Sequence, residues 1–182
     1  MPRILLARHG EAAKGDNILD PPLTKLGFIQ AEELAQKLAI QGRLKITSSP
    51  KLRAKQTAEP LARIWGASIE VVNLVTEIPT PEGILSSQRL PWIRSLLNKE
   101  WTINDKQQKE WRNGIQRYLF SITEDTIVFC HFMVINSIVA YIHKSQKIQQ
   151  FRPEYTSITE LTIKNNQLYL VSLGKEKDSQ IL

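Results

Sequence analysis

Stretches rich in apolar and β-branched residues recur along the chain and alternate with longer stretches in which apolar residues are spaced three or four positions apart. The short stretches predict buried strands at residues 4–7, 44–47, 68–72 and 126–130. Two further runs, 157–163 and 167–173, flank Asn165 and Asn166, and this pair favours the tight turn of a β-hairpin. The pattern therefore predicts strands along most of the chain.

The longer stretches predict amphipathic helices, because residues three or four positions apart lie on one face of a helix. The first helix is expected to begin at Thr24 and to end near Gly42. Its apolar stripe would comprise Phe28, Ala31, Leu34, Ala35 and Leu38. A second helix is expected around 54–65, where Pro60 should bend or split it because proline has no N–H to donate. Later helices are indicated at 111–122 and 134–142.

Residues 78–104 interrupt this alternation, with prolines at 79, 81 and 91 ahead of a short amphipathic segment. We interpret them as an insertion that forms a cap. The strongly charged residues 175–182 are expected to form a frayed tail. The alternation of strands and helices predicts one layered α/β domain over residues 1–174, without repeats or linkers.

Length and composition agree with one folded domain. The chain has 182 residues, of which 42% are hydrophobic and 23% charged, and these values exclude global disorder. No apolar stretch approaches the roughly 20 residues that a membrane span requires, and residues 4–7 are too few for a signal-peptide core. We therefore expect a cytoplasmic protein that does not bind membranes.

The charge balance favours anionic partners, since 24 Lys and Arg residues against 18 Asp and Glu residues give a net charge of +6. The basic residues are scattered and are not interleaved with aromatic residues, so a phosphorylated small molecule is favoured over nucleic acid. A single cysteine, Cys130, excludes an intramolecular disulfide. With three histidines and no CxxC motif, we expect no structural zinc and no cofactor. The oligomeric state stays open.

Candidate chemistry begins at Arg8, His9 and Gly10, directly after the first predicted strand. Ligands of open α/β sheets bind at the carboxyl ends of the strands, so this is a favoured position for a reactive side chain. An incidental histidine in a surface loop is an equally good interpretation of these three residues alone. His131, after the strand at 126–130, occupies a second position of the same kind, although an isolated histidine there is more often structural.

Further motifs decide between these interpretations. They are Leu23-Thr24, Gly27, Gln30-Ala31, Ser48-Ser49-Pro50, Arg53 and Gln56-Thr57-Ala58, followed by His131. In this order they resemble the histidine phosphatase superfamily, also called the phosphoglycerate mutase-like family. The resemblance implies a three-layer αβα sandwich with a mostly parallel, mixed sheet. It places the family's nucleophile on His9, its two phosphate-binding arginines on Arg8 and Arg53, and its second histidine on His131.

These residue types suit phosphoryl transfer on physical grounds. Planar guanidinium groups grip phosphoryl oxygens with paired hydrogen bonds, which a lysine cannot do. The imidazole pKa is about 6.5, so much of His9 is neutral and nucleophilic at pH 7 without a dedicated base. No metal is then required. Arg53 could otherwise be a solvated residue of a helix that also carries Lys51 and Lys55.

The general acid is less sharply indicated. Leu74-Val75-Thr76-Glu77, followed by Glu82-Gly83, is similar to the family segment whose glutamate protonates the leaving oxygen, and Glu77 is our candidate. Glu77 could instead be a loop carboxylate, and Glu11 is the alternative acid. The sequence also departs from the family at Phe132, where a glycine usually follows the second histidine, so the loop is bulkier at the approach to His131.

The resulting hypothesis is a metal-independent phosphatase that hydrolyses phosphomonoesters through a phosphohistidine on His9. A mutase is disfavoured because the insertion is short for the lid that a mutase needs. A protein phosphohistidine phosphatase is a second hypothesis, for which Glu77 would be superfluous. A catalytically weak phosphate-binding module is a third. The physiological substrate is not indicated by any motif.

Overall fold

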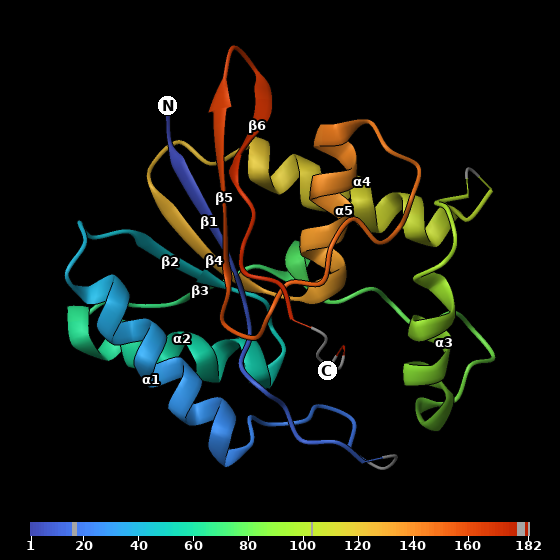
Figure 1. Ribbon diagram of the computed structural model, residues 1–182, viewed down its shortest axis with the longest axis horizontal. Helices are drawn as coiled ribbons and strands as arrows, with labels where there is room; N and C mark the ends of the chain where they lie inside the picture. Colours follow the sequence, from blue (N-terminus) through green and yellow to red (C-terminus); the bar gives the residue numbers. More distant parts are fainter. Residues whose placement is uncertain (16–17, 103, 178–180, 182) are drawn as a thin grey trace.

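Six strands form one mixed sheet in the computed structural model, which describes residues 1–15, 18–102, 104–177 and 181 (Figure 1). The strands are β1 Arg3–Arg8, β2 Lys45–Ser48, β3 Glu70–Val71, β4 Thr126–Cys130, β5 Ile158–Lys164 and β6 Gln167–Ser172. Their order is β3-β2-β4-β1-β5-β6. The strands β3, β2, β4 and β1 are parallel to one another, whereas β5 pairs antiparallel with both β1 and β6.

Helices cover both faces of the sheet. One face carries α1 Lys25–Ala39 and α2 Leu52–Trp65, and the other carries α4 Lys106–Phe120 and α5 Phe132–His143 (Figure 1). Alternate residues of β1 supply both layers, since Leu5 and Ala7 pack in the core with α1 and α2, whereas Ile4 and Leu6 pack in the core with α4 and α5. The predicted αβα sandwich is therefore confirmed.

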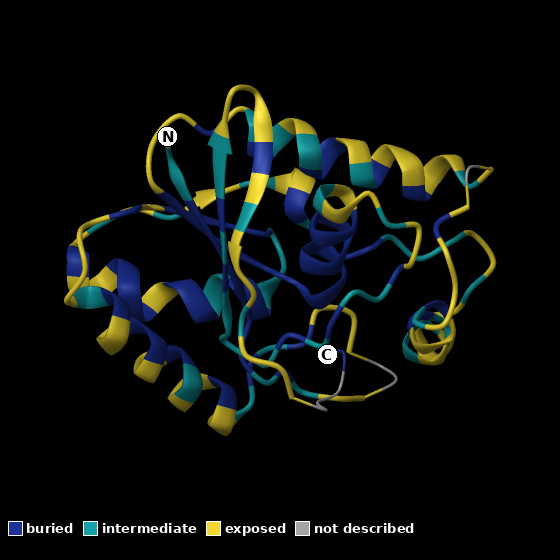
Figure 2. Ribbon diagram, turned by 45° about the horizontal axis from the view of Figure 1, so that its top comes forward, coloured by how far each residue is buried: buried dark blue, intermediate teal, exposed yellow. Residues whose placement is uncertain are grey.

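The helices differ in how much of their surface they bury. In Figure 2, α5 is buried almost throughout, whereas α1 and α4 each show an exposed stripe toward solvent. This agrees with their sequences, because residues 132–140 of α5 are all buried and largely apolar. Among the described residues, no helix is long and apolar enough to cross a membrane.

The segment between β3 and α4 contains two short 3₁₀ turns, η1 Asn73–Val75 and η2 Ser86–Gln88, and the eight-residue helix α3 Arg89–Leu96. Helix α3 lies at the side of the molecule away from α1 and α2 (Figure 1). Ile93 and Leu96 anchor it, because both are buried in the same core as α4 and α5.

Several sequence predictions of local structure need correction. Phe28 is 43% exposed and is not part of the buried stripe of α1. The helix itself ends at Ala39, before Gly42. The strand expected at 68–72 has only two residues. Pro60 does not split α2, which is one helix from Leu52 to Trp65. The lost hydrogen bond is offset because residues on both sides of Pro60, including Ala58 and Leu61, are buried in one core.

The predicted fraying of the C-terminal tail is wrong for residues 175–177. The carbonyl oxygen of Lys175 accepts from the N–H of Glu154 at 2.8 Å, and the N–H of Lys177 donates to the carbonyl oxygen of Arg152 at 3.1 Å. These backbone hydrogen bonds hold a strongly charged segment that has little apolar surface of its own to bury. Ile181 is also buried, whereas 178–180 and 182 lie outside the described residues.

Candidate active site

The parallel strands β1, β2 and β4 are neighbours, so the loops at their carboxyl ends meet at one edge of the sheet. The N–H of His9 donates to the carbonyl oxygen of Cys130 at 3.1 Å, and the N–H of Ser49 donates to that of Phe129 at 2.9 Å. This register brings the two predicted histidines together. The ring centroids of His9 and His131 lie 5.2 Å apart.

The geometry around His9 selects one tautomer. The side chain is fully buried, and Nδ1 lies 2.7 Å from the carbonyl oxygen of Gly10. Because a carbonyl oxygen only accepts, Nδ1 must carry the proton. Nε2 then keeps its lone pair, and Arg53 Nε donates to it at 3.3 Å. Burial, followed by the charges of Arg53 and Arg8, lowers the pKa of His9 well below its usual value, so the ring is neutral at pH 7.

Two buried guanidinium groups flank this ring. Arg53 lies in the first turn of α2 and is only 3% exposed. Arg8 is fully buried at the end of β1, donates from Nη1 to the carbonyl oxygen of Pro153 at 2.8 Å, and lies 4.1 Å from the ring centroid of Tyr155. Burial lowers the pKa of Arg8 to about 10, so it stays positively charged at neutral pH. The site therefore presents two cations to an anion.

Phe132, which stands where the family usually has glycine, is also fully buried. The Arg8 guanidinium carbon lies 5.3 Å from the centroid of the Phe132 ring and 4.1 Å from that of Tyr155. Cation–π attraction from two aromatic rings favours this position of the guanidinium. The larger side chain thus contributes to the surroundings of Arg8 as well as to the loop at His131.

His131 and Ser49 form a second polar pair. His131 Nε2 lies 2.7 Å from Ser49 Oγ, which accepts from the N–H of Lys51 at 3.2 Å. With that acceptor role filled, the hydroxyl proton of Ser49 can be donated to His131 Nε2, which places the imidazole proton on Nδ1. Nδ1 is buried and has no hydrogen-bond partner among the residues that the structure describes. In this tautomer His131 offers a free N–H donor close to His9.

Glu77 is 3% exposed on the loop after η1. The N–H of Ile78 donates to Oε1 at 3.0 Å and that of Met133 to Oε2 at 3.4 Å, while Trp111 Nε1 donates to the carbonyl oxygen of Thr76 at 2.9 Å and fixes the loop. Burial raises the pKa of Glu77, and the charges of Arg89 and Arg53 oppose this shift. A carboxyl group with a raised pKa is suited to donate a proton.

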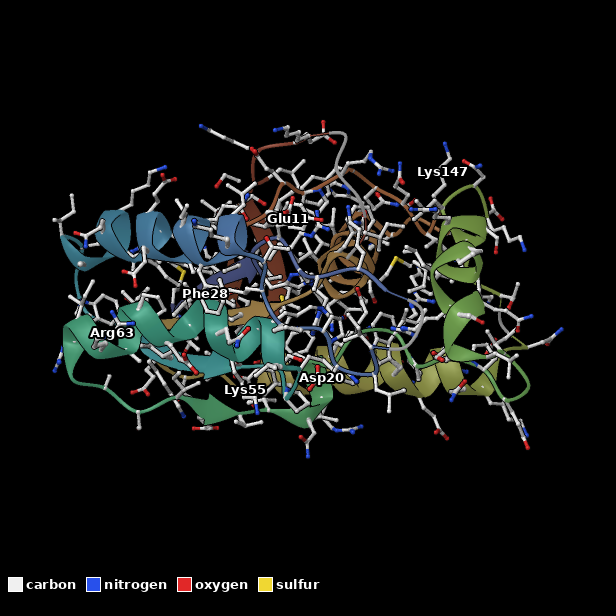
Figure 3. The ribbon with its side chains drawn as sticks, turned by 90° about the horizontal axis from the view of Figure 1, so that it is seen from below. Glu11, Asp20, Phe28, Lys55, Arg63 and Lys147 are labelled. Carbon is white, nitrogen blue, oxygen red and sulfur yellow. The ribbon has the colours of Figure 1, made fainter. Side chains whose placement is uncertain are left out.

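Glu11, the alternative acid, lies in a different setting. Its Oε1 accepts from Thr24 Oγ1 at 2.8 Å, beside the first turn of α1 (Figure 3). It does not line the cavity described below. The structure thus places Glu77, and not Glu11, at the cavity that adjoins Arg53.

A cavity of about 610 Å³ opens beside Arg53 and Glu77. Its walls come from the loop after β1, from the start of α2 and from residues 76–93. His9 does not line this cavity, because it is fully buried; it contacts Arg53, which does line it. The predicted insertion therefore supplies one wall of the cavity.

Arg89, the first residue of α3, also lines this cavity and was missed by the sequence analysis. It belongs to no recognisable motif, and a basic residue at the start of a short helix is typical of a solvated surface. Its position depends on how the insertion folds back over the sheet edge, which local sequence does not reveal.

The loop that carries His9 rests on the start of α1 through two glycines. A Cβ on Gly27 would lie 2.1 Å from the carbonyl oxygen of Glu11, and one on Gly10 would lie 2.7 Å from that of Gly27. Both contacts are with backbone, which cannot yield without moving the loop. We predict that Gly27→Ala lowers the free energy of unfolding by about 1–3 kcal/mol or more. Urea denaturation measures this effect.

Gly42→Ala is the matched control, because nothing lies within 4 Å of a Cβ at that position. Its effect is expected to stay within about 0.5 kcal/mol. Equal stabilities of the Gly27 and Gly42 variants would contradict the close packing between the loop and α1.

Within the part of the chain that the structure describes, no group of three or more His, Cys, Asp or Glu side chains could hold a metal ion. The charged groups at the sheet edge are instead Arg8, Arg53, Arg89 and Glu77. Their chemistry fits an anionic ligand better than a cation.

Comparison with known proteins gives a consistent result. Residues 4–176 match the family model of the histidine phosphatase superfamily (branch 1). No curated protein matches the sequence significantly.

Solved structures share the fold at low sequence identity. A phosphoserine phosphatase from Entamoeba histolytica, in complex with 3-phosphoglyceric acid, is 19% identical with a TM-score of 0.74, covering 97% of this chain and 98% of its own. A mycobacterial glucosyl-3-phosphoglycerate phosphatase is 18% identical with a TM-score of 0.73, covering 93% and 97%. Mycobacterial hydrolase 1 is 18% identical with a TM-score of 0.70, covering 97% and 99%.

Proposed function

The chain belongs to the histidine phosphatase superfamily, and we propose that it is a metal-independent phosphatase that hydrolyses small phosphomonoesters through a phosphohistidine on His9. The observation that carries the proposal is the state of the His9 ring. Its Nδ1 proton is held by the Gly10 carbonyl, and its unprotonated Nε2 faces the Arg53 guanidinium. An unprotonated ring nitrogen beside a cation is the arrangement that attack on a phosphoryl group requires, once the Arg53 N–H donates to the phosphoryl group instead of to Nε2. The phosphatases among the structural neighbours support the same class of reaction.

In the first step, Arg8 and Arg53 bind the phosphoryl oxygens, and the Nδ1–H of His131 donates a further hydrogen bond. His9 Nε2 attacks phosphorus in line with the leaving oxygen. The phosphorus–oxygen bond breaks, and protonated Glu77 gives its proton to that oxygen, so that an alcohol leaves. The phosphoryl group is then bonded to His9, and Glu77 is a carboxylate.

In the second step, the Glu77 carboxylate accepts a proton from a water molecule, whose oxygen attacks phosphorus. The phosphorus–nitrogen bond breaks, and its electron pair returns to His9 Nε2. Inorganic phosphate leaves, and Glu77 is protonated again. Both proton transfers thus use one carboxyl group, and the enzyme returns to its starting state.

Hydrolysis of p-nitrophenyl phosphate tests the proposal directly. We expect turnover that survives exhaustive chelation, because Arg8 and Arg53 supply the positive charge that binds the phosphoryl group. Inorganic phosphate and vanadate should inhibit competitively. Loss of turnover in chelator, restored by a divalent ion, would refute a metal-independent mechanism.

The planar fork of Arg53 leads to a further prediction. Arg53→Lys keeps the charge but loses the paired hydrogen bonds, so kcat/KM should fall by about 10² to 10³. The same substitution at Arg63, which lies on α2 with its side chain 67% exposed, is the control and should leave kcat/KM unchanged (Figure 3). If both variants behave like the unmodified protein, Arg53 does not bind the phosphoryl group.

A further inference from the structure

Arg89 is a charged group of the cavity that the proposed reaction does not use. It lines the same cavity as Arg53 and Glu77 and is partly buried, and burial lowers its pKa. Its guanidinium donates to Thr80 Oγ1 from Nη1. In the described part of the chain, no carboxylate lies within ion-pairing distance of Arg89. Its guanidinium therefore forms no direct ion pair among the described residues, and Glu77 attracts it only from a longer distance.

Apolar and polar side chains share the cavity with Arg89. Ile78, Pro79, Ile84, Leu90 and Ile93 line it, together with the hydroxyl residues Thr76, Thr80, Ser86 and Ser87. A cationic group partly buried in such a wall loses hydration, and a directly paired anion offsets this cost better than the more distant Glu77 does. The cavity of about 610 Å³ is also much larger than a phosphoryl group alone needs.

From this arrangement we propose that the substrate is a phosphomonoester whose leaving group has an apolar body and carries a carboxylate that binds Arg89. The inference rests on the proposed phosphatase function and extends it to the leaving group. The apolar body would pack on Ile84, Leu90 and Ile93, while the guanidinium forms paired hydrogen bonds with the carboxylate. Lys14 and Lys51 also line the cavity, but only a guanidinium matches the planar, two-oxygen geometry of a carboxylate. A carboxylate also carries less charge than a second phosphate, which the Glu77 carboxyl group in the same cavity would repel more strongly after it has given up its proton.

The test compares substrates that differ only in the charge of the leaving group. Benzyl phosphate, 3- and 4-carboxybenzyl phosphate, and 4-carbamoylbenzyl phosphate have the same alkyl leaving oxygen and similar size. We expect one of the carboxybenzyl esters to have a kcat/KM about 10 to 100 times that of the two neutral esters, mainly through a lower KM. In Arg89→Gln this preference should fall to about one.

Two further variants complete the experiment. Arg94→Gln is the matched control, since Arg94 is exposed on α3 and does not line the cavity, and it should keep the full preference. Arg89→Lys keeps the charge without the fork and should retain part of the preference. Because the preference is a ratio of two rates on one protein sample, it does not depend on how much of a variant is folded.

The ratio between charged and neutral esters separates the proposal from other roles of Arg89. If Arg89 acted only by tuning the pKa of Glu77, Arg89→Gln would change turnover of all four esters by the same factor and leave the ratio unchanged. That result would overturn the proposal, as would equal turnover of neutral and carboxylated esters by the unmodified protein. If no ester is hydrolysed, p-nitrophenyl phosphate included, the phosphatase function itself is wrong and the inference falls with it.

Discussion

His9→Ala will lower turnover of every phosphomonoester by at least about 10⁴, because the variant lacks the nitrogen that accepts the phosphoryl group. Neither neighbouring group can replace it. Arg53 stays protonated and is not a nucleophile, and the Nε2 atom of His131 faces Ser49 Oγ at 2.7 Å, whereas that of His9 faces the phosphate-binding Arg53. Initial rates with p-nitrophenyl phosphate, measured beside the unmodified protein, give the size of the loss.

His143→Ala is the control for this measurement, since His143 is exposed at the end of α5. It should turn over substrate at the normal rate. The His9 variant should keep the far-ultraviolet circular dichroism of the unmodified protein. A folded His9→Ala protein with normal turnover would show that another group is the nucleophile.

Glu77→Gln is expected to slow the hydrolysis of an alkyl phosphate by about 10² to 10⁴, the usual range for a general acid. An alkoxide is a poor leaving group unless it is protonated as the bond breaks, whereas p-nitrophenolate leaves readily without help. The phosphorylation step with p-nitrophenyl phosphate should therefore suffer much less. Burst kinetics separate this step from dephosphorylation, which can also slow because the same carboxyl group activates water.

The pH dependence follows from two opposite pKa shifts. His9 must be neutral to attack, and burial lowers its pKa, so activity should persist well below pH 6.5. Glu77 must be protonated to act as the acid, and burial raises its pKa, so activity on an alkyl phosphate should fall as the pH rises through that raised value. In Glu77→Gln this decline with rising pH should disappear.

Two other carboxylates serve as comparisons for Glu77. Glu82→Gln changes an exposed residue outside the cavity and should leave both substrates unaffected. If Glu11→Gln, and not Glu77→Gln, slows the alkyl phosphate selectively, the acid is Glu11. If neither matters and phosphohistidine is much the better substrate, the protein is a phosphohistidine phosphatase instead.

The strands and most helices were predictable because their signals are local. The strand at 126–130 has the same bounds in the structure, and the turn at Asn165 and Asn166 has positive φ at both residues, as a tight hairpin turn requires. Thr24 caps α1 by accepting from the N–H of Gly27 at 3.0 Å. Each of these features depends on a few neighbouring residues, which sequence patterns record well.

The features that sequence did not reveal depend on contacts between distant segments. Pro60 stays inside α2 because the core holds the helix on both sides, and residues 175–177 are held by 152–154. At the site, the segment between α5 and β5 brings Tyr155 over Arg8, and the insertion brings Arg89 to the cavity. His9, Arg53 and His131 were suggested by motifs, whereas no motif marked Tyr155 or Arg89.

The central claim, a phosphoryl group bonded to His9, is tested most directly by rapid quenching after the protein is mixed with radiolabelled p-nitrophenyl phosphate. Phosphohistidine is labile in acid and stable in base, whereas phosphoserine resists acid. The account predicts a base-stable, acid-labile label that maps to the peptide containing His9 and is absent from His9→Ala. A label that survives acid, or one that still forms in folded His9→Ala, would contradict it.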